Sequence, residues 1–230
     1  MTQRNIQNIK VAVDAVVFAY KEKTLSVLLV KQKFGVNKDQ WVLPGGLVKD
    51  DEPLKEAVER ELFEEAGIKV NYLEQLFTFG DDINRDPRNR VISVSYFALV
   101  NPTKMKLKSG TDAKDAEWFP LDEIPQLPFD HNKIIHTSIK RIQSKLAYQP
   151  IGFELLNKEF PFSDLENLYQ TILNKEIDRR NFRKKILSFG LLNETDKMSQ
   201  KGAGRPAKLF KFNQSKYNKL VKEGFLFEIK

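Results

Sequence analysis

Apolar and alternating positions predict a mixed fold over the first two thirds of the chain. Five segments have the length and pattern of β-strands: 11–19, 25–31, 72–80, 91–100 and 116–120. A turn at 21–24 joins the first two, and a short strand at Trp41 leads into Gly45 and Gly46, where backbone can approach a ligand closely. A further helix is predicted over about 131–147.

The helix predicted between Pro53 and Gly67 has a marked start, a marked stop and two distinct faces. At about 100° per residue, one arc carries an apolar set: Leu54, Val58, Leu62 and Ala66. The adjoining arc carries an acidic set: Glu61, Glu64 and Glu65. The acidic residues are therefore expected beside the buried face of the helix.

The last third of the chain predicts a separate, smaller arrangement. Five elements are expected: helices over 165–173, 179–189 and 215–223, and strands over 191–195 and 207–212. Ser163 or Asp164 is expected to cap the first helix and Asp178 the second. Residues 155–162 are predicted as a strand or an extended connector.

Composition indicates a globular protein with more than one core, and charge divides it. The 230 residues are 41% hydrophobic and 30% charged, with no cysteine, which fits a reducing cytoplasm. No apolar run of 18 residues and no signal-peptide pattern is present, so no membrane association is expected. Residues 164–230 hold 15 basic and 8 acidic residues and so carry the whole net charge of +7, which indicates a polyanion-binding part.

The acidic arc of the first helix predicts a metal site. Carboxylates three and four residues apart repel one another, and here they crowd beside a core. A solvated acidic face is the usual explanation of a charge run, but a divalent cation explains both the crowding and the position, because Mg²⁺ takes carboxylate oxygens and keeps sites open for phosphate. Arg60 is placed to pair with a glutamate such as Glu52 and hold the ligands in position.

Residues 41–68 resemble the Nudix hydrolases, and the Nudix box from Gly46 to Ile68 is complete. The resemblance implies an α/β/α sandwich, a bound Mg²⁺ or Mn²⁺, and cleavage of a diphosphate linked to another moiety. It implies metal ligation by three carboxylates and a carbonyl: Glu61, Glu64, Glu65 and Gly46. Glu64 or Glu65 would orient or deprotonate the attacking water, and Arg60 and Glu52 complete the implied catalytic set.

Two further stretches resemble the ADP-ribose-type Nudix proteins: the RDPR sequence after Phe79-Gly80, and LPFDHNKII. Arg85 and Arg88 are candidates for contacts with ligand phosphates, because guanidinium groups match phosphate geometry. A solvated turn is the equal alternative for a loop rich in Asp and Arg. Phe79 can contact a base or simply pack.

Glu117 and the two histidines are further polar residues whose roles the sequence leaves open. Glu117 can supply an extra metal ligand or base from outside the box, or be an ordinary charge at a strand edge. His131 and His136 are the only histidines, and we expect capping or packing rather than catalysis from them.

The order helix, basic helix and basic hairpin predicts a winged helix-turn-helix, whose second helix enters the major groove while the wing reaches the backbone or the minor groove. The alternative is a basic appendage with no nucleic-acid partner. Eight residues are candidates for DNA contacts: Arg179, Arg180, Asn181, Arg183, Lys184, Lys201, Arg205 and Lys208. Lys197 also lies at this wing.

A Nudix domain (1–150), a linker (151–162) and a winged helix-turn-helix (163–230) together resemble the bacterial Nudix-related transcriptional regulators. The resemblance implies an α+β protein, a homodimer that binds a double-stranded operator, and control of NAD or sugar metabolism by an effector such as ADP-ribose or a sugar. Many such regulators have a degenerate box, whereas this box is intact. A magnesium-dependent diphosphohydrolase of ADP-ribose type is therefore the alternative.

Overall fold

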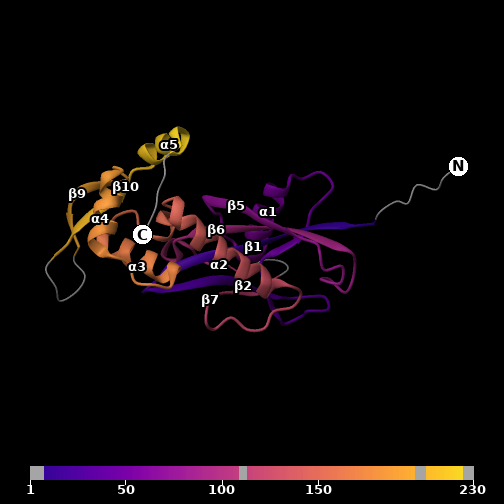
Figure 1. The fold of residues 1–230 in the computed structure, drawn as a ribbon. Coiled ribbons are helices and arrows are strands. Elements are labelled where there is room, and N and C mark those ends of the chain that lie inside the picture. The colour runs from indigo at the N-terminus through magenta and orange to yellow at the C-terminus, as the bar shows by residue number, and fades with distance from the viewer. Residues whose placement is uncertain (1–7, 109–112, 200–205, 225–230) are drawn as a thin grey trace. The chain divides into compact units, whose positions relative to one another are not determined.

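β1 (Lys10–Lys21) is the central strand of the larger sheet in the computed structural model, which describes residues 8–108, 113–199 and 206–224 (Figure 1). Every residue from Ala12 to Tyr20 is buried. A strand that is apolar at nearly every position has both faces covered. It pairs in parallel with β6 (Val91–Val100) along ten residues.

Five further strands complete this sheet: β2 (Thr24–Gln32), β3 (Trp41–Val42), β4 (Gly45–Leu47), β5 (Tyr72–Phe79) and β7 (Ala113–Pro120). Their order is β3-β2-β1-β6-β5, with β4 paired to β1 and β7 to β2. β7 begins at Ala113, three residues earlier than expected, because its pairing with β2 continues past an irregularity to Gln32. The predicted strands are therefore all present; the start of β7 differs by three residues and several other ends by one or two.

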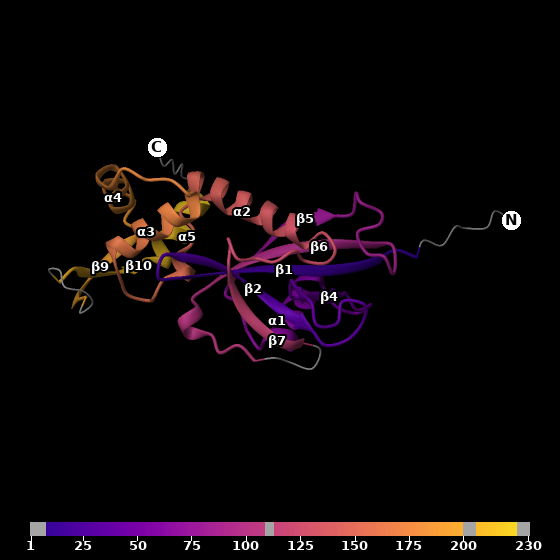
Figure 2. The same cartoon turned by 90° about the horizontal axis from the view of Figure 1, so that it is seen from below.

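Helices cover both faces of this sheet, as Figure 2 shows for α1 (Leu54–Ala66) and the first part of α2 (His131–Tyr148). On the α1 side, alternate residues of β1 such as Val13 and Val17 join Val58 and Leu62 of α1 in one apolar cluster. Gly67 ends α1 in the left-handed conformation, at φ 68°, as its position after Ala66 predicted. The predicted α/β/α layering is present.

The chain divides into two compact units inside three of its regular elements. The first contains the chain up to Ala19 together with Ser26–Ser138, including the short 3₁₀ helix η1 (Pro102–Lys104). The second contains Tyr20–Leu25 and the chain from Ile139. The division therefore falls within β1, β2 and α2, each of which contributes residues to both units.

The second unit has the element order of a winged helix. Its elements are η2 (Phe153–Leu155), β8 (Phe160–Pro161), α3 (Phe162–Leu173), α4 (Arg179–Ser188), β9 (Leu192–Met198), β10 (Lys208–Phe212) and α5 (Gln214–Glu223). Its strands form a sheet in the order β8-β10-β9. Aromatic side chains join helices to sheet: the Phe162 ring lies 5.9 Å from that of Phe182 and 6.0 Å from that of Phe210, all three buried.

Two boundaries in this unit differ from the prediction by three residues. α3 is preceded by Pro161 rather than capped by Ser163 or Asp164, because the chain leaves the short strand β8 directly into the helix at the buried Phe162. β9 continues to Met198, three residues beyond the expected end, because it pairs with β10 as far as Lys208. The Asp178 cap of α4 is confirmed, since its side chain accepts a hydrogen bond from the amide of Asn181.

Within the described part of the chain, no helix has both the length and the apolar character needed to cross a bilayer.

Candidate functional site

Three carboxylates surround the guanidinium of Arg60 on α1. Arg60 Nη2 lies 2.5 Å from Glu52 Oε1, and Nη1 lies 2.7 Å from Glu61 Oε1 and 3.0 Å from Glu64 Oε2. Arg60 Nε also donates to Glu52 over 2.8 Å, so the pair is bidentate and matches the expected contact. Glu52 precedes the helix, and the other three residues lie on its adjoining turns, which brings all four together.

The charges of this cluster are unevenly compensated. The hydrogen bond from Arg60 lowers the pKa of Glu52 to about 2. Burial raises the pKa of Glu61 in spite of Arg60, and the neighbouring charges of Glu64 and Glu52 raise it further. One guanidinium therefore does not neutralise three carboxylates, and the cluster has a surplus of negative charge.

Glycines bring backbone close to this cluster. A side chain at position 46 would place its Cβ 2.3 Å from Glu61 Oε1, so only glycine allows this approach. At Gly45 a Cβ would lie 2.2 Å from the carbonyl oxygen of Val13. The amide of Gly45 donates to Glu65 Oε2 over 2.9 Å, and Glu65 is buried.

These residues fit a divalent cation chemically. Among the described residues, no three acidic or histidine side chains are arranged around one metal position. However, negative charge is in surplus, Glu61 is destabilised in its ionised form, and the Gly46 backbone lies against it. Glu61, Glu64, Glu65 and the carbonyl of Gly46 are the groups that would hold a cation, and one oxygen of Glu65, Oε2, also accepts from the amide of Gly45.

A pocket of about 80 Å³ lies beside this cluster in the same unit. Its lining includes Asp14, Gly46, Arg85, Arg88, Phe129 and His131. Sites for small molecules usually measure about 300–1,000 Å³, so a nucleotide-sized ligand would be only partly enclosed here. The sequence-predicted arginines thus meet the glycine of the Nudix box at one pocket.

Arg85 is a buried residue of this pocket's lining. Its side chain is 4% exposed, and its Nη2 lies 2.6 Å from Asp130 Oδ1 and 3.3 Å from Asp14 Oδ2. Its Nε also donates to Asp130. The guanidinium that was expected to meet ligand phosphates is therefore held by two carboxylates of the protein.

Asp14 is the centre of a buried hydrogen-bond network. Ser93 Oγ donates to its Oδ2, and His131 Nε2 lies 3.5 Å from its Oδ1. His131 Nδ1 accepts from the amide of Leu43 over 3.0 Å, which places the imidazole proton on Nε2, facing Asp14. Burial alone would raise the pKa of Asp14, but the hydrogen bonds from His131 and Ser93 and the charge of Arg85 hold it below its ordinary value.

Arg88 is the more exposed of the two arginines that line the pocket. Its side chain is 47% exposed and pairs with Asp86 over 2.7 Å, which lowers the pKa of Asp86. Its guanidinium also lies 5.4 Å from the ring centre of Phe129, whose backbone has a φ of 56°. A positive φ is uncommon for an aromatic residue and is found where surrounding structure imposes it.

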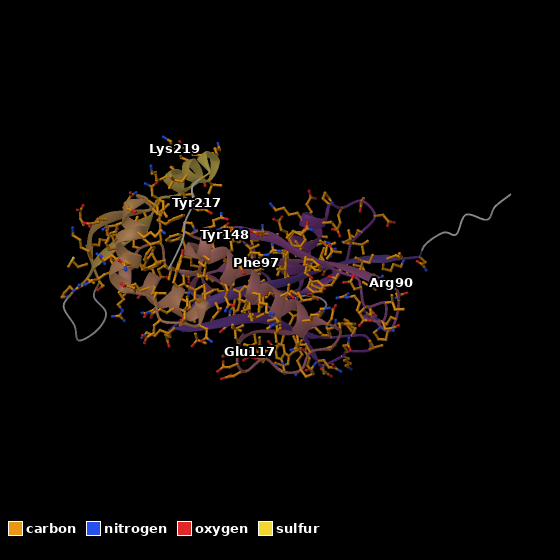
Figure 3. All side chains as sticks on the ribbon, viewed as in Figure 1. Arg90, Phe97, Glu117, Tyr148, Tyr217 and Lys219 are labelled. Carbon is orange, nitrogen blue, oxygen red and sulfur yellow. The ribbon has the colours of Figure 1, made fainter. Side chains whose placement is uncertain are left out.

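Phe79 and Glu117 do not line this pocket. Phe79 is buried and packs edge-on against Phe77, with ring centres 5.5 Å apart, and it also lines a second pocket of about 130 Å³. Glu117 is exposed on β7, and Figure 3 places it at the outer edge of the ribbon. No ion pair of Glu117 occurs with any residue that the structure describes.

Sequence reasoning missed Asp14, Asp130 and Phe129. A signal for Asp14 was present, because an acidic residue inside the apolar run VAVDAVV can only be buried in a strand covered on both faces. Asp130 and Phe129 lie next to His131 in the LPFDHNKII stretch, but nothing local pairs Asp130 with Arg85, which is 45 residues away.

The candidate DNA contacts of α4 fall into three groups. Arg179, Arg180 and Lys184 are exposed. Asn181 is also exposed, but its side chain donates to Asp178 Oδ2 over 2.9 Å and so supports the helix cap. The Arg183 guanidinium lies 4.5 Å from the Phe162 ring centre and 5.6 Å from that of Phe210, so it covers the aromatic core.

The wing residues lie on and between β9 and β10. Lys208 forms an exposed ion pair with Glu194 over 2.5 Å, and Lys197 forms one with Glu159 over 2.9 Å. Exposed pairs of this kind contribute little and release their lysines readily to another anion. Lys201 and Arg205 lie outside the described residues.

Family models match both units of the chain. The NUDIX domain matches residues 8–138, and the NrtR DNA-binding winged helix domain matches residues 152–212. The chain is 31% identical over 210 residues to the ADPR responsive transcriptional repressor NtrR of Acinetobacter baylyi, covering 90% of this chain and 83% of that protein. The chain belongs to the NrtR family of Nudix-domain transcriptional regulators. The α+β fold and the resemblance inferred from its motifs are thereby confirmed.

Two further proteins are similar to this chain, the first along most of its length and the second over about half of it. Shewanella oneidensis NrtR, in its crystal structure complexed with a 27mer DNA, superposes with a TM-score of 0.80 at 31% identity, covering 90% of this chain and 95% of that one. The ADP-ribose pyrophosphatase of Methanocaldococcus jannaschii is 42% identical over 127 residues, which cover 54% of this chain and 70% of that protein. Enzymes of the Nudix family typically use divalent metal ions.

Proposed function

We propose that this NrtR-family protein is a transcriptional repressor whose Nudix domain binds ADP-ribose and whose winged helix binds a double-stranded operator. The observation that carries the proposal is the presence, in one chain, of both domains of an ADP-ribose-responsive repressor and of a DNA-bound NrtR. The proposed setting is the cytoplasm, and the regulated genes belong to NAD or sugar metabolism.

The pocket beside Gly46 is the proposed place for ADP-ribose, a diphosphate between two ribosyl groups. Arg88 is half-exposed there and held by a single carboxylate, so its guanidinium can turn to a phosphate with little loss. Arg85 contributes differently, as a fixed cation of the pocket lining, because two carboxylates hold it, the buried Asp14 and the largely buried Asp130. A sugar ligand is the alternative effector for the same pocket.

α4 is the proposed recognition helix. Arg180 and Lys184 present exposed cations on it, and Arg179 begins it, so phosphates and base edges of one groove are within reach of one helix. A homodimer is part of the proposal, and it requires a palindromic operator with half-sites about one helical turn, or a multiple, apart.

A mobility-shift titration of the full chain against its own upstream DNA tests this function. Affinity for that DNA should exceed affinity for a scrambled duplex at physiological salt, and ADP-ribose should lower it. Because phosphate contacts release counterions, log affinity should fall by roughly 0.9 per contact for each log unit of salt. Equal affinity for both duplexes, or no response to ADP-ribose, would show the repressor function to be wrong.

Hydrolysis of ADP-ribose is a second candidate function, favoured by the complete acidic cluster around Arg60 and by the similarity to a pyrophosphatase. Mg²⁺ or Mn²⁺ would be held by Glu61, Glu64, Glu65 and the Gly46 carbonyl. When bound, such an ion makes a coordinated water a nucleophile near neutral pH. Glu64, the most exposed of the three carboxylates, is the proposed proton acceptor.

Chromatography of the products decides between sensing and hydrolysis. Slow conversion of ADP-ribose to AMP and ribose 5-phosphate is expected, and Glu64→Gln should abolish it. The matched control is Glu59→Gln, an exposed glutamate on the same helix that pairs only with Lys55. If wild type leaves ADP-ribose intact for hours with either metal, the domain is a sensor and not an enzyme.

A further inference from the structure

The second unit holds more than the winged helix. The turn between β1 and β2, Tyr20–Leu25, belongs to it, and so does α2 from Ile139 onward. Both of these segments form hydrogen bonds with the last turn of α3. α3 is the helix that immediately precedes the recognition helix α4.

Gln143 of α2 caps the end of α3. Its Nε2 donates to the carbonyl oxygen of Ile172 over 2.9 Å. The last four carbonyls of a helix have no partner within the helix, so this bond satisfies a group that would otherwise need water. α3 ends at Leu173, and the following residue, Asn174, has the left-handed conformation.

Thr171 makes the corresponding contact with the β1–β2 turn. Its Oγ1 donates to the carbonyl oxygen of Lys23 over 3.4 Å. Glu22 and Lys23 both have positive φ, 51° and 66°, which is the geometry of a two-residue hairpin turn whose twist matches its strands. The direction of the Lys23 carbonyl is therefore fixed by the two strands.

β1 and α2 also lie next to each other at the pocket beside Gly46, far along each element from its contact with α3. β1 carries Asp14, and α2 begins at His131, and these two side chains lie 3.5 Å apart in the pocket lining. Arg85 ties the same region together through Asp14 and Asp130. β1 and α2 are continuous between the pocket and the last turn of α3.

Between the pocket and α3, two hydroxyl groups of α2 form hydrogen bonds with carbonyl groups of the same helix. Thr137 Oγ1 donates to the carbonyl of Lys133 over 2.8 Å, and Ser138 Oγ donates to that of Ile135 over 2.7 Å. Such hydroxyl bonds within a helix weaken it slightly and often bend it. They lie at the end of the first unit, next to Ile139, where the second begins.

We propose that Thr171 and Gln143 couple the pocket to the recognition helix, by linking the last turn of α3 to β1 and to α2. This rests on the proposed ADP-ribose response. A ligand that displaces the Asp14–Arg85–His131 network changes the position of β1 against α2 within the first unit. The last turn of α3 follows, and with it the turn that leads into α4. A ligand can shift this equilibrium only through different affinities for the two states.

The test is the coupling factor, the ratio of operator affinities without and with ADP-ribose. It should be about 5- to 150-fold in wild type, the usual range for allosteric coupling. In the full-length double variant T171V/Q143L it should fall at least 5-fold toward 1. Operator affinity without ligand and ADP-ribose affinity should each stay within about 2-fold, which a merely structural defect would not allow.

Two variants serve as controls. Ser163→Ala removes an exposed hydroxyl from the first turn of the same helix and should keep wild-type coupling. Thr171→Ser keeps the hydroxyl and, combined with native Gln143, should also keep it, while Thr171→Val alone should reduce it.

Full coupling in T171V/Q143L, or equal loss in Ser163→Ala, would overturn the proposal. If the double variant does not fold, the comparison of Thr171→Val with Thr171→Ser decides instead, and equal coupling in these two overturns it. A wild type that binds the operator but ignores ADP-ribose would instead refute the proposed effector, an outcome visible before any variant is made.

Discussion

Arg60 and Arg85 are two arginines of one domain, each surrounded by carboxylates, yet their surroundings assign them different tasks. Arg60 is 18% exposed, and its three glutamates leave negative charge uncompensated. Arg85 is 4% exposed and lies between two aspartates, of which Asp14 is also contacted by Ser93 and His131. The first cluster can take up a further cation, whereas the second is complete.

Burial decides this difference. In the Arg85 cluster the low dielectric strengthens each contact, and the loss of one partner leaves a buried charge uncompensated. In the Arg60 cluster burial instead raises the pKa of Glu61, which means that its ionised form is destabilised. A bound cation would stabilise that ionised form. One cluster is therefore a structural support, and the other is a candidate binding site.

The largest expected effect is the loss of stability in Arg85→Ala. Removing this guanidinium leaves Asp14 and Asp130 without their cation, so the free energy of unfolding should fall by about 3–5 kcal/mol. Urea unfolding measures it. Arg88→Ala is the matched control, an arginine of the same loop with one carboxylate partner and 47% exposure, and should cost at most about 1 kcal/mol. Equal costs would remove the distinction that burial makes.

The next effect concerns metal binding at the Arg60 cluster. Mg²⁺ that binds only the folded state stabilises it by about 2.7 kcal/mol at a hundred times its Kd, so the thermal midpoint should rise with millimolar Mg²⁺. The double variant Glu61→Gln with Glu64→Gln should lose this rise, and Glu59→Gln should keep it. A wild-type midpoint that does not respond to Mg²⁺ or Mn²⁺ contradicts the metal site.

These two clusters also show what sequence could and could not predict. The Arg60 cluster is local: Arg60, Glu61 and Glu64 lie within two turns of one helix, and helical spacing alone places them together. The strands, the two helices and the winged helix followed from periodicity and turn residues in the same way. The strand boundaries with the largest shifts lie where pairing with another strand extended them, as at Ala113 and Met198.

The Arg85 cluster is long-range, and sequence predicted it only as a loop arginine. Its partners are 71 and 45 residues away, and no spacing rule connects them. The same limit applies to Arg183, which is exposed on α4 but also lies over two phenylalanines, a contact that charge pattern does not reveal. Contacts of a motif were predictable, and contacts set by the folded sheet were not.

A third prediction uses pH to sharpen the comparison. The pKa of Asp14 is lower in the folded state than its ordinary value near 3.9, so its contribution to stability is present above that value and is lost as pH falls through the folded pKa. The unfolding free energy of wild type should therefore drop more steeply below about pH 4 than that of Asp14→Asn. Parallel pH profiles from urea unfolding would mean that Asp14 is not held in its ionised form.

The smallest expected effect extends the comparison to an arginine that lies over aromatic rings. Arg183 lies over Phe162 and Phe210, and an exposed cation–π contact of this kind contributes about 0.5–1 kcal/mol. Arg183→Ala should lower the unfolding free energy by that amount and leave the base preference of the operator unchanged. Arg180→Ala, the matched change three residues earlier on α4, should leave stability unchanged and cost about 1–3 kcal/mol in operator affinity. Mobility shifts on single-base operator variants separate the two: loss of base preference in Arg183→Ala would return this arginine to the DNA interface, where charge pattern alone had placed it.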